Sequence, residues 1–367
     1  MSQIHTLTMP KWGLSMTEGR VDTWLKQEGD RVEKGEALLD VETDKISSSV
    51  ETPFSGVLKR VLAQPDETLS VGALLAIIVE GDVSDAQIDE VVERFQAEFV
   101  PAADAAESTG PAAQKIELHG RTLRYFDMGE GGTPLVLIHG FGGDLNNWLF
   151  NHQVLAAHRR VIALDLPGHG ESGKTLQTGD LDELSHSVLA LLDHLEIDTA
   201  HLAGHSMGGA VALNVARLAP RRVASLILIA SAGLGADING DYLQGFVDAN
   251  NRNALKPQLT KLFSDPGLVN RQMLEDMLKF KRLEGVSDAL QQLVDQLFAG
   301  ARQTIDLRAQ VGVKPSLVIW GAQDEIIPAH HAQGLSARIE ILPGQSHMVQ
   351  MEAADQVNHL IEDFLKG

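Results

Sequence analysis

The sequence predicts two domains of different fold class: a small all-β domain in residues 1–80 and an α/β domain in residues 115–367. In the first part, short apolar segments follow one another closely between turn residues, which is typical of a small all-β fold. In the second part, unbroken apolar runs alternate with helical patterns, which indicates a mainly parallel sheet covered by helices. With 367 residues, 44% of them hydrophobic, the chain is long enough to form two cores.

The all-β domain is predicted from six strand patterns. Turns such as Glu28-Gly29-Asp30 and Pro53-Phe54-Ser55-Gly56 separate them at close spacing. The expected strands are Ile4–Met9, Gly19–Leu25, Ala37–Thr43, Ile46–Glu51, Gly56–Leu62 and Leu74–Val79.

One lysine, Lys45, lies between two of these strands. Apolar and polar residues alternate on both sides of Asp44-Lys45, which predicts two half-buried strands joined by a turn that exposes the lysine. Taken alone, this pattern also fits an ordinary solvated turn lysine. The segment 9–19 (MPKWGLSMTEG) precedes it, however, and adds a second feature.

Together, these two features resemble the lipoyl domain of the dihydrolipoyl acyltransferase components of 2-oxo acid and acetoin dehydrogenase complexes. The resemblance covers the first domain and implies a flattened β-barrel with lipoate attached covalently to Lys45. A biotin carrier domain would have methionine on both sides of the lysine, whereas the neighbours here are Asp44 and Ile46. Lipoylation is therefore the preferred interpretation.

A segment of different composition, residues 81–114, follows the first domain. It is acidic, with Arg94 as its one basic residue, so charge repulsion should extend it. Apolar residues at helical spacing after Ser84 predict one helix with Ser84 as its N-cap. Residues 101–113 are rich in alanine and proline and predict a flexible linker. The glycine- and arginine-containing motif of a peripheral subunit-binding domain is not found here.

The α/β domain is predicted from buried strands and a helical insertion. Apolar positions recur at helical spacing within residues 234–309, where strand signals stop, and we expect this insertion to form a lid. The unbroken apolar strands are Leu135–Ile138, Val161–Leu164, Leu226–Ile229 and Leu317–Trp320.

A serine in this domain has the surroundings of a nucleophile. Gly204-His205-Ser206-Met207-Gly208 matches G-x-S-x-G between a predicted strand and a predicted helix, and side chains at Gly204 or Gly208 would collide with backbone in such a sharp turn. Asp324 and His347 follow later strands, in the order Ser, Asp, His that this fold uses.

The domain therefore resembles the α/β-hydrolase superfamily over residues 115–367. The resemblance implies that Ser206 is the nucleophile, His347 the general base and Asp324 the residue that orients the imidazole. It also implies an oxyanion hole formed by the backbone N–H groups of Phe141 and Met207. The histidines of the motif loops, His139, His169 and His205, are expected to be structural, and no ligand spacing indicates a metal site.

Composition excludes several classes of function. The formal charge of −20 disfavours nucleic acid and anionic membranes as partners. The chain has no cysteine, so disulfides are excluded and an acyl-enzyme must use an oxygen nucleophile or a bound cofactor. Neither a signal-peptide pattern nor a membrane-spanning apolar run is found, and a cytoplasmic location is expected.

The fusion of a lipoyl domain to a serine acyl-transfer site resembles the acetyltransferase components of acetoin-cleaving dehydrogenase systems. The resemblance implies that acetyl groups carried on lipoyl-Lys45 pass to coenzyme A, through acetyl-Ser206 or by direct attack of the thiol with His347 as base. It implies two partners, a thiamine diphosphate-dependent acetoin dehydrogenase component and dihydrolipoamide dehydrogenase. The His-x-x-x-Asp-Gly motif of conventional lipoyl acyltransferases is absent.

Three alternatives remain open from the sequence. The second domain is also compatible with a plain esterase or thioesterase, or with a catalytically silent scaffold beside a lipoyl carrier. The chain is also compatible with an interaction module that recruits the two dehydrogenases. For coenzyme A, a basic stretch of the lid supplies candidate phosphate contacts, some of which would bind it, although ordinary solvated helix faces are the preferred explanation. These residues are Arg252, Lys256, Lys261, Arg271, Lys279, Lys281 and Arg282.

Overall fold

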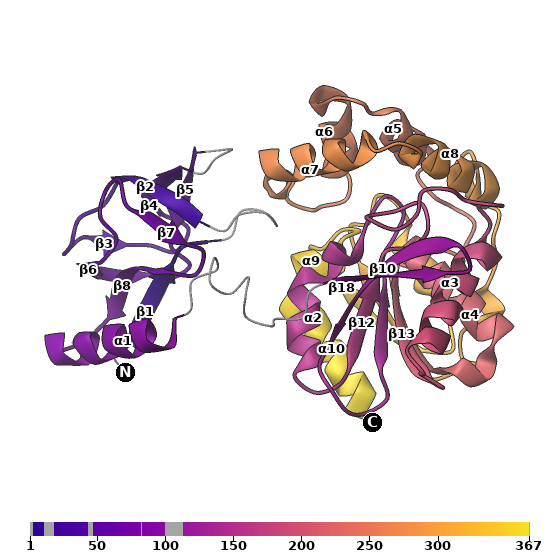
Figure 1. The fold of residues 1–367 in the computed structure, drawn as a ribbon, viewed down its shortest axis with the longest axis horizontal. Helices are drawn as coiled ribbons and strands as arrows, with labels where there is room; N and C mark the ends of the chain where they lie inside the picture. Colours follow the sequence, from indigo (N-terminus) through magenta and orange to yellow (C-terminus); the bar gives the residue numbers. More distant parts are fainter. Residues whose placement is uncertain (1–2, 11–17, 43–46, 82, 100–112, 367) are drawn as a thin grey trace. The chain divides into compact units, whose positions relative to one another are not determined.

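The structure, a computed structural model, describes residues 3–10, 18–42, 47–81, 83–99 and 113–366. The chain divides into two units, residues 1–110 and 111–367, and each is described by itself (Figure 1). The expected fold class, an all-β domain followed by an α/β domain with a helical lid, is confirmed.

The first unit contains two four-stranded antiparallel sheets, with strand orders β1-β8-β6-β3 and β5-β4-β2-β7. Inward-facing residues of both sheets, including Val21, Leu39, Leu58 and Leu75, form one core. The strands are β1 (Gln3–Thr8), β2 (Glu18–Trp24), β3 (Arg31–Val32), β4 (Ala37–Glu42), β5 (Ser47–Glu51), β6 (Gly56–Val61), β7 (Thr68–Ser70) and β8 (Leu74–Glu80).

All six expected strands of this unit are found, but two others were missed. β3 and β7 have only two or three residues each, too few to show an alternating pattern. β4 and β5 pair in antiparallel register as far as Glu42 opposite Ser47. The predicted turn with Lys45 falls between these residues and lies outside the described residues.

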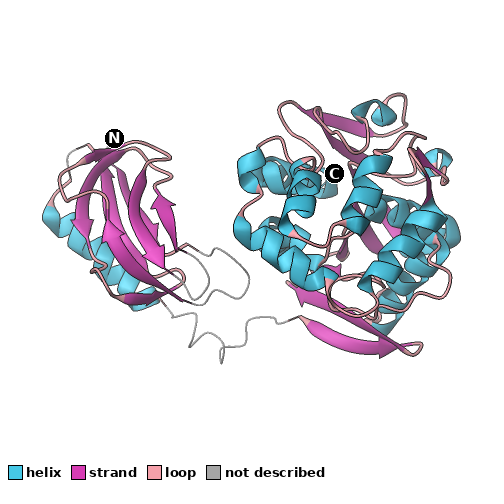
Figure 2. Ribbon diagram, turned by 90° about the horizontal axis from the view of Figure 1, so that it is seen from above, coloured by secondary structure: helices cyan, strands magenta, loops and turns pink. Residues whose placement is uncertain are grey.

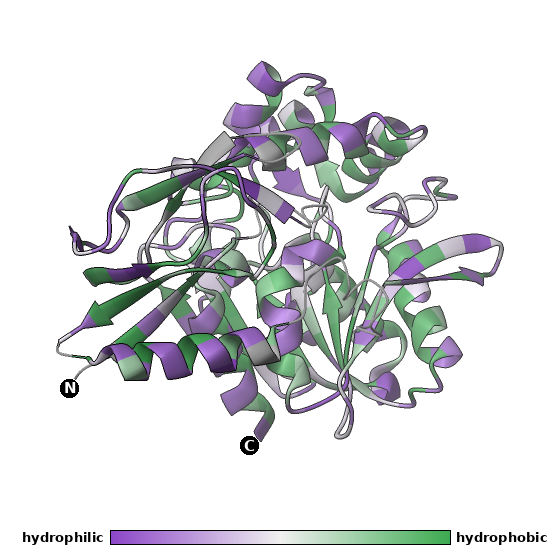
Figure 3. Ribbon diagram, turned by 60° about the vertical axis from the view of Figure 1, so that its left-hand side comes forward, coloured by the Kyte–Doolittle hydropathy of each residue, from purple (hydrophilic) through white to green (hydrophobic). Residues whose placement is uncertain are grey.

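The expected helix of the acidic segment is α1 (Asp85–Glu98), and it belongs to the first unit. Ser84 is its N-cap, and the Gln87 side chain accepts a hydrogen bond from the Ser84 N–H at 3.0 Å. Ile88 and Val92 pack on Ile77 and Val79 of β8. Figure 3 shows polar and apolar residues alternating along this helix, so its apolar face covers the sheet that contains β8.

The second unit is built on an eight-stranded sheet of order β18-β17-β14-β13-β11-β12-β10-β9. The six strands from β18 to β12 are parallel to their neighbours, while β10 and β9 pair antiparallel at one edge. The strands are β9 (Gln114–Leu118), β10 (Arg121–Met128), β11 (Leu135–Ile138), β12 (Val161–Leu164), β13 (Ala200–His205), β14 (Val223–Ile229), β17 (Ser316–Gly321) and β18 (Arg338–Leu342).

Helices cover both faces of this sheet (Figure 2). Alternate residues of one strand belong to different cores: Val136 packs with the helices α3 and α4, whereas Leu137 packs with α2 and α10. The unbroken apolar runs are explained by this double burial. These helices are α2 (Leu149–Ala156), α3 (Leu181–His194), α4 (Met207–Leu218), α9 (Val349–Glu352) and α10 (Ala354–Lys366).

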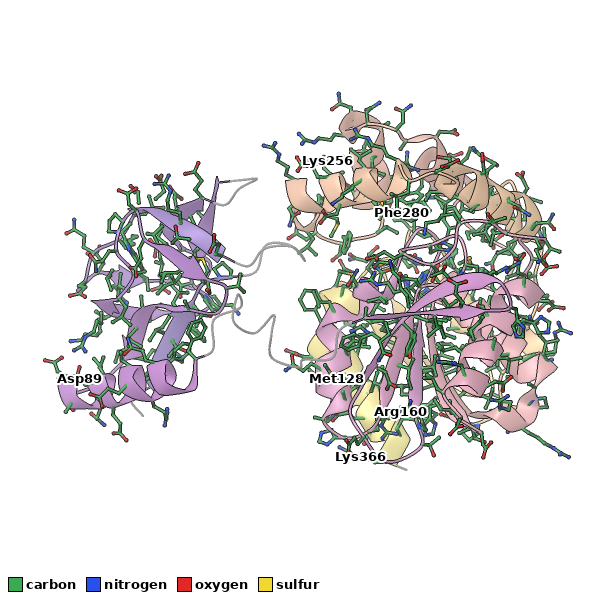
Figure 4. The ribbon with its side chains drawn as sticks, viewed as in Figure 1. Asp89, Met128, Arg160, Lys256, Phe280 and Lys366 are labelled. Carbon is green, nitrogen blue, oxygen red and sulfur yellow. The ribbon has the colours of Figure 1, made fainter. Side chains whose placement is uncertain are left out.

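The helical insertion lies between β14 and β17. It contains α5 (Gly240–Asp248), α6 (Arg252–Thr260), α7 (Arg271–Lys281) and α8 (Val286–Leu297). Phe280 of α7 packs against the core, on the side of the lid that faces the sheet (Figure 4). A small hairpin, β15 (Phe298–Ala299) and β16 (Arg302–Gln303), was not expected, because strands of two residues carry no periodic signal. None of the helices in the described ranges is long and apolar enough to cross a membrane.

Candidate active site

Ser206 occupies a sharp turn between β13 and α4. Its backbone has φ 54° and ψ −121°, an unfavourable conformation for a residue with a side chain, and its side chain is nearly buried. A Cβ at Gly204 would collide with the Gly208 carbonyl oxygen, and one at Gly208 would collide with the Ile138 carbonyl oxygen. The predicted role of the two glycines is confirmed: they let the strand and helix approach closely enough to hold Ser206 at the end of the sheet.

The structure brings Ser206, His347 and Asp324 together from three separate loops. His347 Nε2 lies 3.0 Å from Ser206 Oγ, and His347 Nδ1 lies 2.8 Å from Asp324 Oδ2. Because the carboxylate can only accept, Nδ1 carries the proton and Nε2 is free to accept the hydroxyl proton of Ser206. The three residues therefore have the geometry of a nucleophile, a base and an orienting acid.

The side chain of Asp324 is fully buried, and both of its carboxylate oxygens accept hydrogen bonds. Oδ1 accepts from the backbone N–H groups of Ile326 and Ile327, at 2.8 and 3.0 Å. Oδ2 accepts from Trp320 Nε1 at 3.0 Å in addition to His347. Trp320 was not among the predicted site residues, although it ends the predicted strand that precedes the Asp324 loop. This arrangement compensates the burial of the charge and fixes the carboxylate plane.

The three motif histidines have structural contacts, as expected. His139 Nε2 accepts from the Leu166 N–H at 2.9 Å, and burial lowers the pKa of His139 to about 4. Burial also lowers the pKa of His169 to about 3, and its Nδ1 donates to the Pro167 carbonyl. His205 Nε2 donates to the backbone carbonyl of His347 at 3.0 Å, and burial holds its pKa well below the usual value. His205 therefore supports the loop that holds His347.

The predicted oxyanion residues line the same cavity as Ser206. Within the described chain, neither the Phe141 N–H nor the Met207 N–H donates a hydrogen bond to another backbone or side-chain group. A Cβ at Gly140 would lie 2.9 Å from Ser206 Cβ, so the loop preceding Phe141 approaches the serine closely. Two free N–H groups beside the nucleophile are what an oxyanion hole requires.

The cavity over Ser206 is small and mostly apolar. Its volume is about 60 Å³, which gives space for about four water-sized spheres. The lid supplies much of the lining, including Tyr242 and Phe246 of α5 and Met277 of α7. Burial raises the pKa of the Tyr242 hydroxyl, so this group stays neutral.

The basic stretch of the lid does not form one exposed surface. Lys281, grouped above with the candidate contacts for coenzyme A, is only 8% exposed and donates to the carbonyl of Phe246 at 2.6 Å. Lys281 therefore stabilises the lid from inside and does not present its charge to a ligand. Arg252 and Arg271 both pair with Glu275. Lys256, Lys279 and Arg282 are exposed.

The remaining predicted site residue, Lys45, lies outside the described residues. The neighbouring strands β4 and β5 fit attachment at a hairpin, because they are antiparallel neighbours with residues 43–46 between their paired ends.

Comparison with known proteins supports both domains. The family model of the α/β hydrolase fold matches residues 133–361, and the biotin/lipoyl model, described as a biotin-requiring enzyme, matches residues 5–78. A meta-cleavage product hydrolase from Pseudomonas fluorescens IP01 has a similar fold, with a TM-score of 0.62 and 23% identity over 69% of this chain and 97% of that one.

Two curated relatives match the whole chain. A dihydrolipoyllysine-residue acetyltransferase component of an acetoin cleaving system from Pseudomonas putida is 71% identical over 100% of both chains. A protein of the same name from Cupriavidus necator is 46% identical over 99% of this chain and 98% of its own. The chain therefore belongs to the family of dihydrolipoyllysine-residue acetyltransferase components of acetoin cleaving systems.

Proposed function

We propose that this protein is the acetyltransferase component of an acetoin cleaving system, and that it transfers acetyl groups from lipoyl-Lys45 to coenzyme A through Ser206. The observation that carries the proposal is an assembled Ser206–His347–Asp324 site in the same chain as a biotin/lipoyl-type domain. A carrier thioester needs an acyl acceptor, and an activated serine under a closed lid is a suitable one. Lipoate supplies the thiol that carries the acetyl group.

In the first half-reaction, His347 Nε2 takes the Ser206 proton while Oγ attacks the carbonyl carbon of the thioester substrate. The N–H groups of Phe141 and Met207 stabilise the resulting oxyanion. The carbon–sulfur bond then breaks, and His347 returns its proton to the leaving dihydrolipoyl thiolate. The products are acetyl-Ser206 and a free thiol.

In the second half-reaction, His347 takes the proton of the coenzyme A thiol and the sulfur attacks acetyl-Ser206. The carbon–oxygen bond breaks, Ser206 regains its proton, and acetyl-coenzyme A leaves. Water would compete for the same ester, and its hydrolysis is downhill. The cavity supports transfer because its mostly apolar walls, many of them from the lid, offer few hydrogen-bond partners to a competing water.

For coenzyme A, we assign the phosphate contacts to the exposed cations Lys279 and Arg282 at the end of α7. Alanine at both positions should raise the KM for coenzyme A with little change in kcat, because phosphate attraction contributes to binding before the chemical step. Lys59→Ala, which changes an exposed lysine of the first unit, is the control. An unchanged KM in the double variant would refute the assignment.

The proposal includes two protein partners, a thiamine diphosphate-dependent acetoin dehydrogenase component and dihydrolipoamide dehydrogenase, and a cytoplasmic location. The names of the relatives support only that other components of a system exist. Co-purification of the full-length chain with each dehydrogenase tests the partners, and cell fractionation tests the location.

The test of the proposed reaction uses two acetyl donors. With free acetyl-dihydrolipoamide and coenzyme A, wild-type protein should form acetyl-coenzyme A, and Ser206→Ala should lose this activity. Lys45→Ala should keep activity on the free donor but lose turnover in the reconstituted system, whereas Lys34→Ala, another exposed lysine of the first unit, should keep both. Acetate as the main product would identify a thioesterase instead, and full activity of Ser206→Ala would identify a scaffold.

A further inference from the structure

Three side chains of types that can bind a metal ion come together outside the cavity over Ser206. Asp237 lies in the segment between β14 and α5, where the lid begins, and His330 and His331 lie in a short 3₁₀ helix, Ala329–Ala332. Asp237 Oδ2 is 3.7 Å from His330 Nε2 and 3.8 Å from His331 Nε2, and one ligand atom from each residue lies within 4.8 Å of the others. The chain thus places two imidazoles and a carboxylate around one point.

His331 has unused bonding capacity at this point. Its side chain is only 3% exposed, yet within the described part of the chain neither ring nitrogen has a hydrogen-bond partner. Buried polar groups normally have partners, so an unpartnered imidazole that faces a carboxylate indicates a missing ligand. A Cβ at Gly235 would collide with the His331 ring, which shows that the backbone packs directly against it.

The surrounding hydrogen bonds hold the backbone of the site in place. Gln303 Nε2 donates to the Asp237 carbonyl at 3.1 Å. Arg308 Nη1 donates to the carbonyls of both Leu234 and His331, at 2.9 and 3.0 Å, which holds the start of the lid against the 3₁₀ helix. His330 and Asp237 are exposed, so their side chains can adjust and solvent can reach the site.

We propose that Asp237, His330 and His331 bind a divalent transition metal of the zinc class. Two neutral imidazoles and a carboxylate are ligands that zinc prefers, and water would complete a tetrahedral site. Metal–ligand bonds of 2.0–2.1 Å place neighbouring ligand atoms about 3.3 Å apart, so the Asp237–His distances of 3.7 and 3.8 Å need to shorten by less than 1 Å. Mg²⁺ and Ca²⁺ prefer oxygen ligands and would bind weakly here.

Such an ion would connect the lid to the loop of the triad acid. On the lid side, Asn239 N donates to the Ile326 carbonyl and Asn239 Nδ2 donates to the Glu325 carbonyl, so the segment that starts at Asp237 already touches the Asp324 loop. On the other side, the His331 ring lies against Trp320, whose Nε1 donates to Asp324. The metal would therefore strengthen the attachment of the lid base without contacting the reacting atoms.

The test is zinc titration of untagged full-length protein by calorimetry after dialysis against a chelator. Wild-type protein should bind one Zn²⁺ per chain, and Asp237→Asn and His330→Gln should each weaken binding at least about tenfold. Both positions are exposed, so both variants should fold. His158→Gln is the matched control, because His158 is an exposed histidine that pairs with one carboxylate, Glu362, without a second imidazole.

Co²⁺ gives a second readout that does not depend on activity. Its visible absorption should appear in the wild-type and His158→Gln proteins and be lost in Asp237→Asn and His330→Gln, while Mg²⁺ should not displace it. Wild-type protein that binds no zinc would overturn the proposal. Equal zinc affinity in all four proteins would also overturn it, because the ion would then be bound elsewhere, for example at His347.

Discussion

Asp324→Asn separates the electrostatic role of the triad acid from its volume. The asparagine side chain has nearly the same shape, but it presents one oxygen and one NH₂ group where the carboxylate accepts from four donors. If the oxygen faces the N–H groups of Ile326 and Ile327, the NH₂ group faces Trp320 Nε1 and His347 Nδ1. His347 must then place its proton on Nε2, which can no longer accept the Ser206 proton.

The magnitude follows from this change of tautomer. The same substitution in a serine protease triad lowers kcat about ten-thousandfold, which corresponds to about 5.5 kcal/mol of transition-state stabilisation. The Trp320 N–H would lose its acceptor on Asp324 but keep the Ile327 carbonyl at 3.0 Å, so the free energy of unfolding should fall by only about 0.5–1.5 kcal/mol.

The assay is acetyl-coenzyme A formation from acetyl-dihydrolipoamide, with urea unfolding of the same samples. Asp265→Asn is the control, because Asp265 is an exposed aspartate that accepts from the Gly267 N–H and does not line the cavity. We expect nearly full activity in the control and a large loss of kcat in Asp324→Asn. A folded Asp324→Asn protein with more than a tenth of the wild-type kcat would refute the assigned role of His347 as base.

Three further predictions concern stability. Gly204→Ala should lower the free energy of unfolding by about 2 kcal/mol or more, because the added methyl group collides with backbone. Gly173→Ala is the control and should unfold in urea like the wild type, because the nearest atom to its added methyl group lies at 3.5 Å. Burial lowers the pKa of His139 to about 4, so this residue contributes roughly 3 kcal/mol to the free energy of unfolding. The contribution is complete above pH 6.5 and is lost as the pH falls toward 4. A free energy of unfolding that increases as the pH falls from 6.5 to 4 would contradict the assignment. Ile88→Ala should cost about 2–5 kcal/mol and speed hydrogen exchange in β8, while Gln96→Ala on the exposed side of α1 should leave exchange unchanged.

The sequence predicted most of the sheet because each central strand is buried on both faces. An unbroken run such as Leu135–Ile138 has one simple structural explanation, and the structure gives these same bounds. The short strands β3, β7, β15 and β16 were missed, since their pairing depends on partners distant in sequence. Ser206 was predictable because the sharp turn requires glycines two positions before and after it, at Gly204 and Gly208.

Other parts of the site could not be predicted because they depend on tertiary contacts. Lys281 belongs to a basic stretch in the sequence, but in the structure its ammonium group donates to carbonyls of α5. Asp237 comes close to His330 and His331 only when the base of the lid packs against the 3₁₀ helix. No local spacing of residues could have indicated that cluster.

The central claim is that acetyl groups pass through Ser206 on their way to coenzyme A, and intact mass spectrometry of rapidly quenched turnover tests it most directly. We predict an acetyl adduct that maps to Ser206 when the acetyl donor is present without coenzyme A, and that disappears as acetyl-coenzyme A forms when coenzyme A is added. The adduct should be absent in Ser206→Ala. Transfer at the wild-type rate by Ser206→Ala, with no adduct on the wild-type serine, would contradict the account.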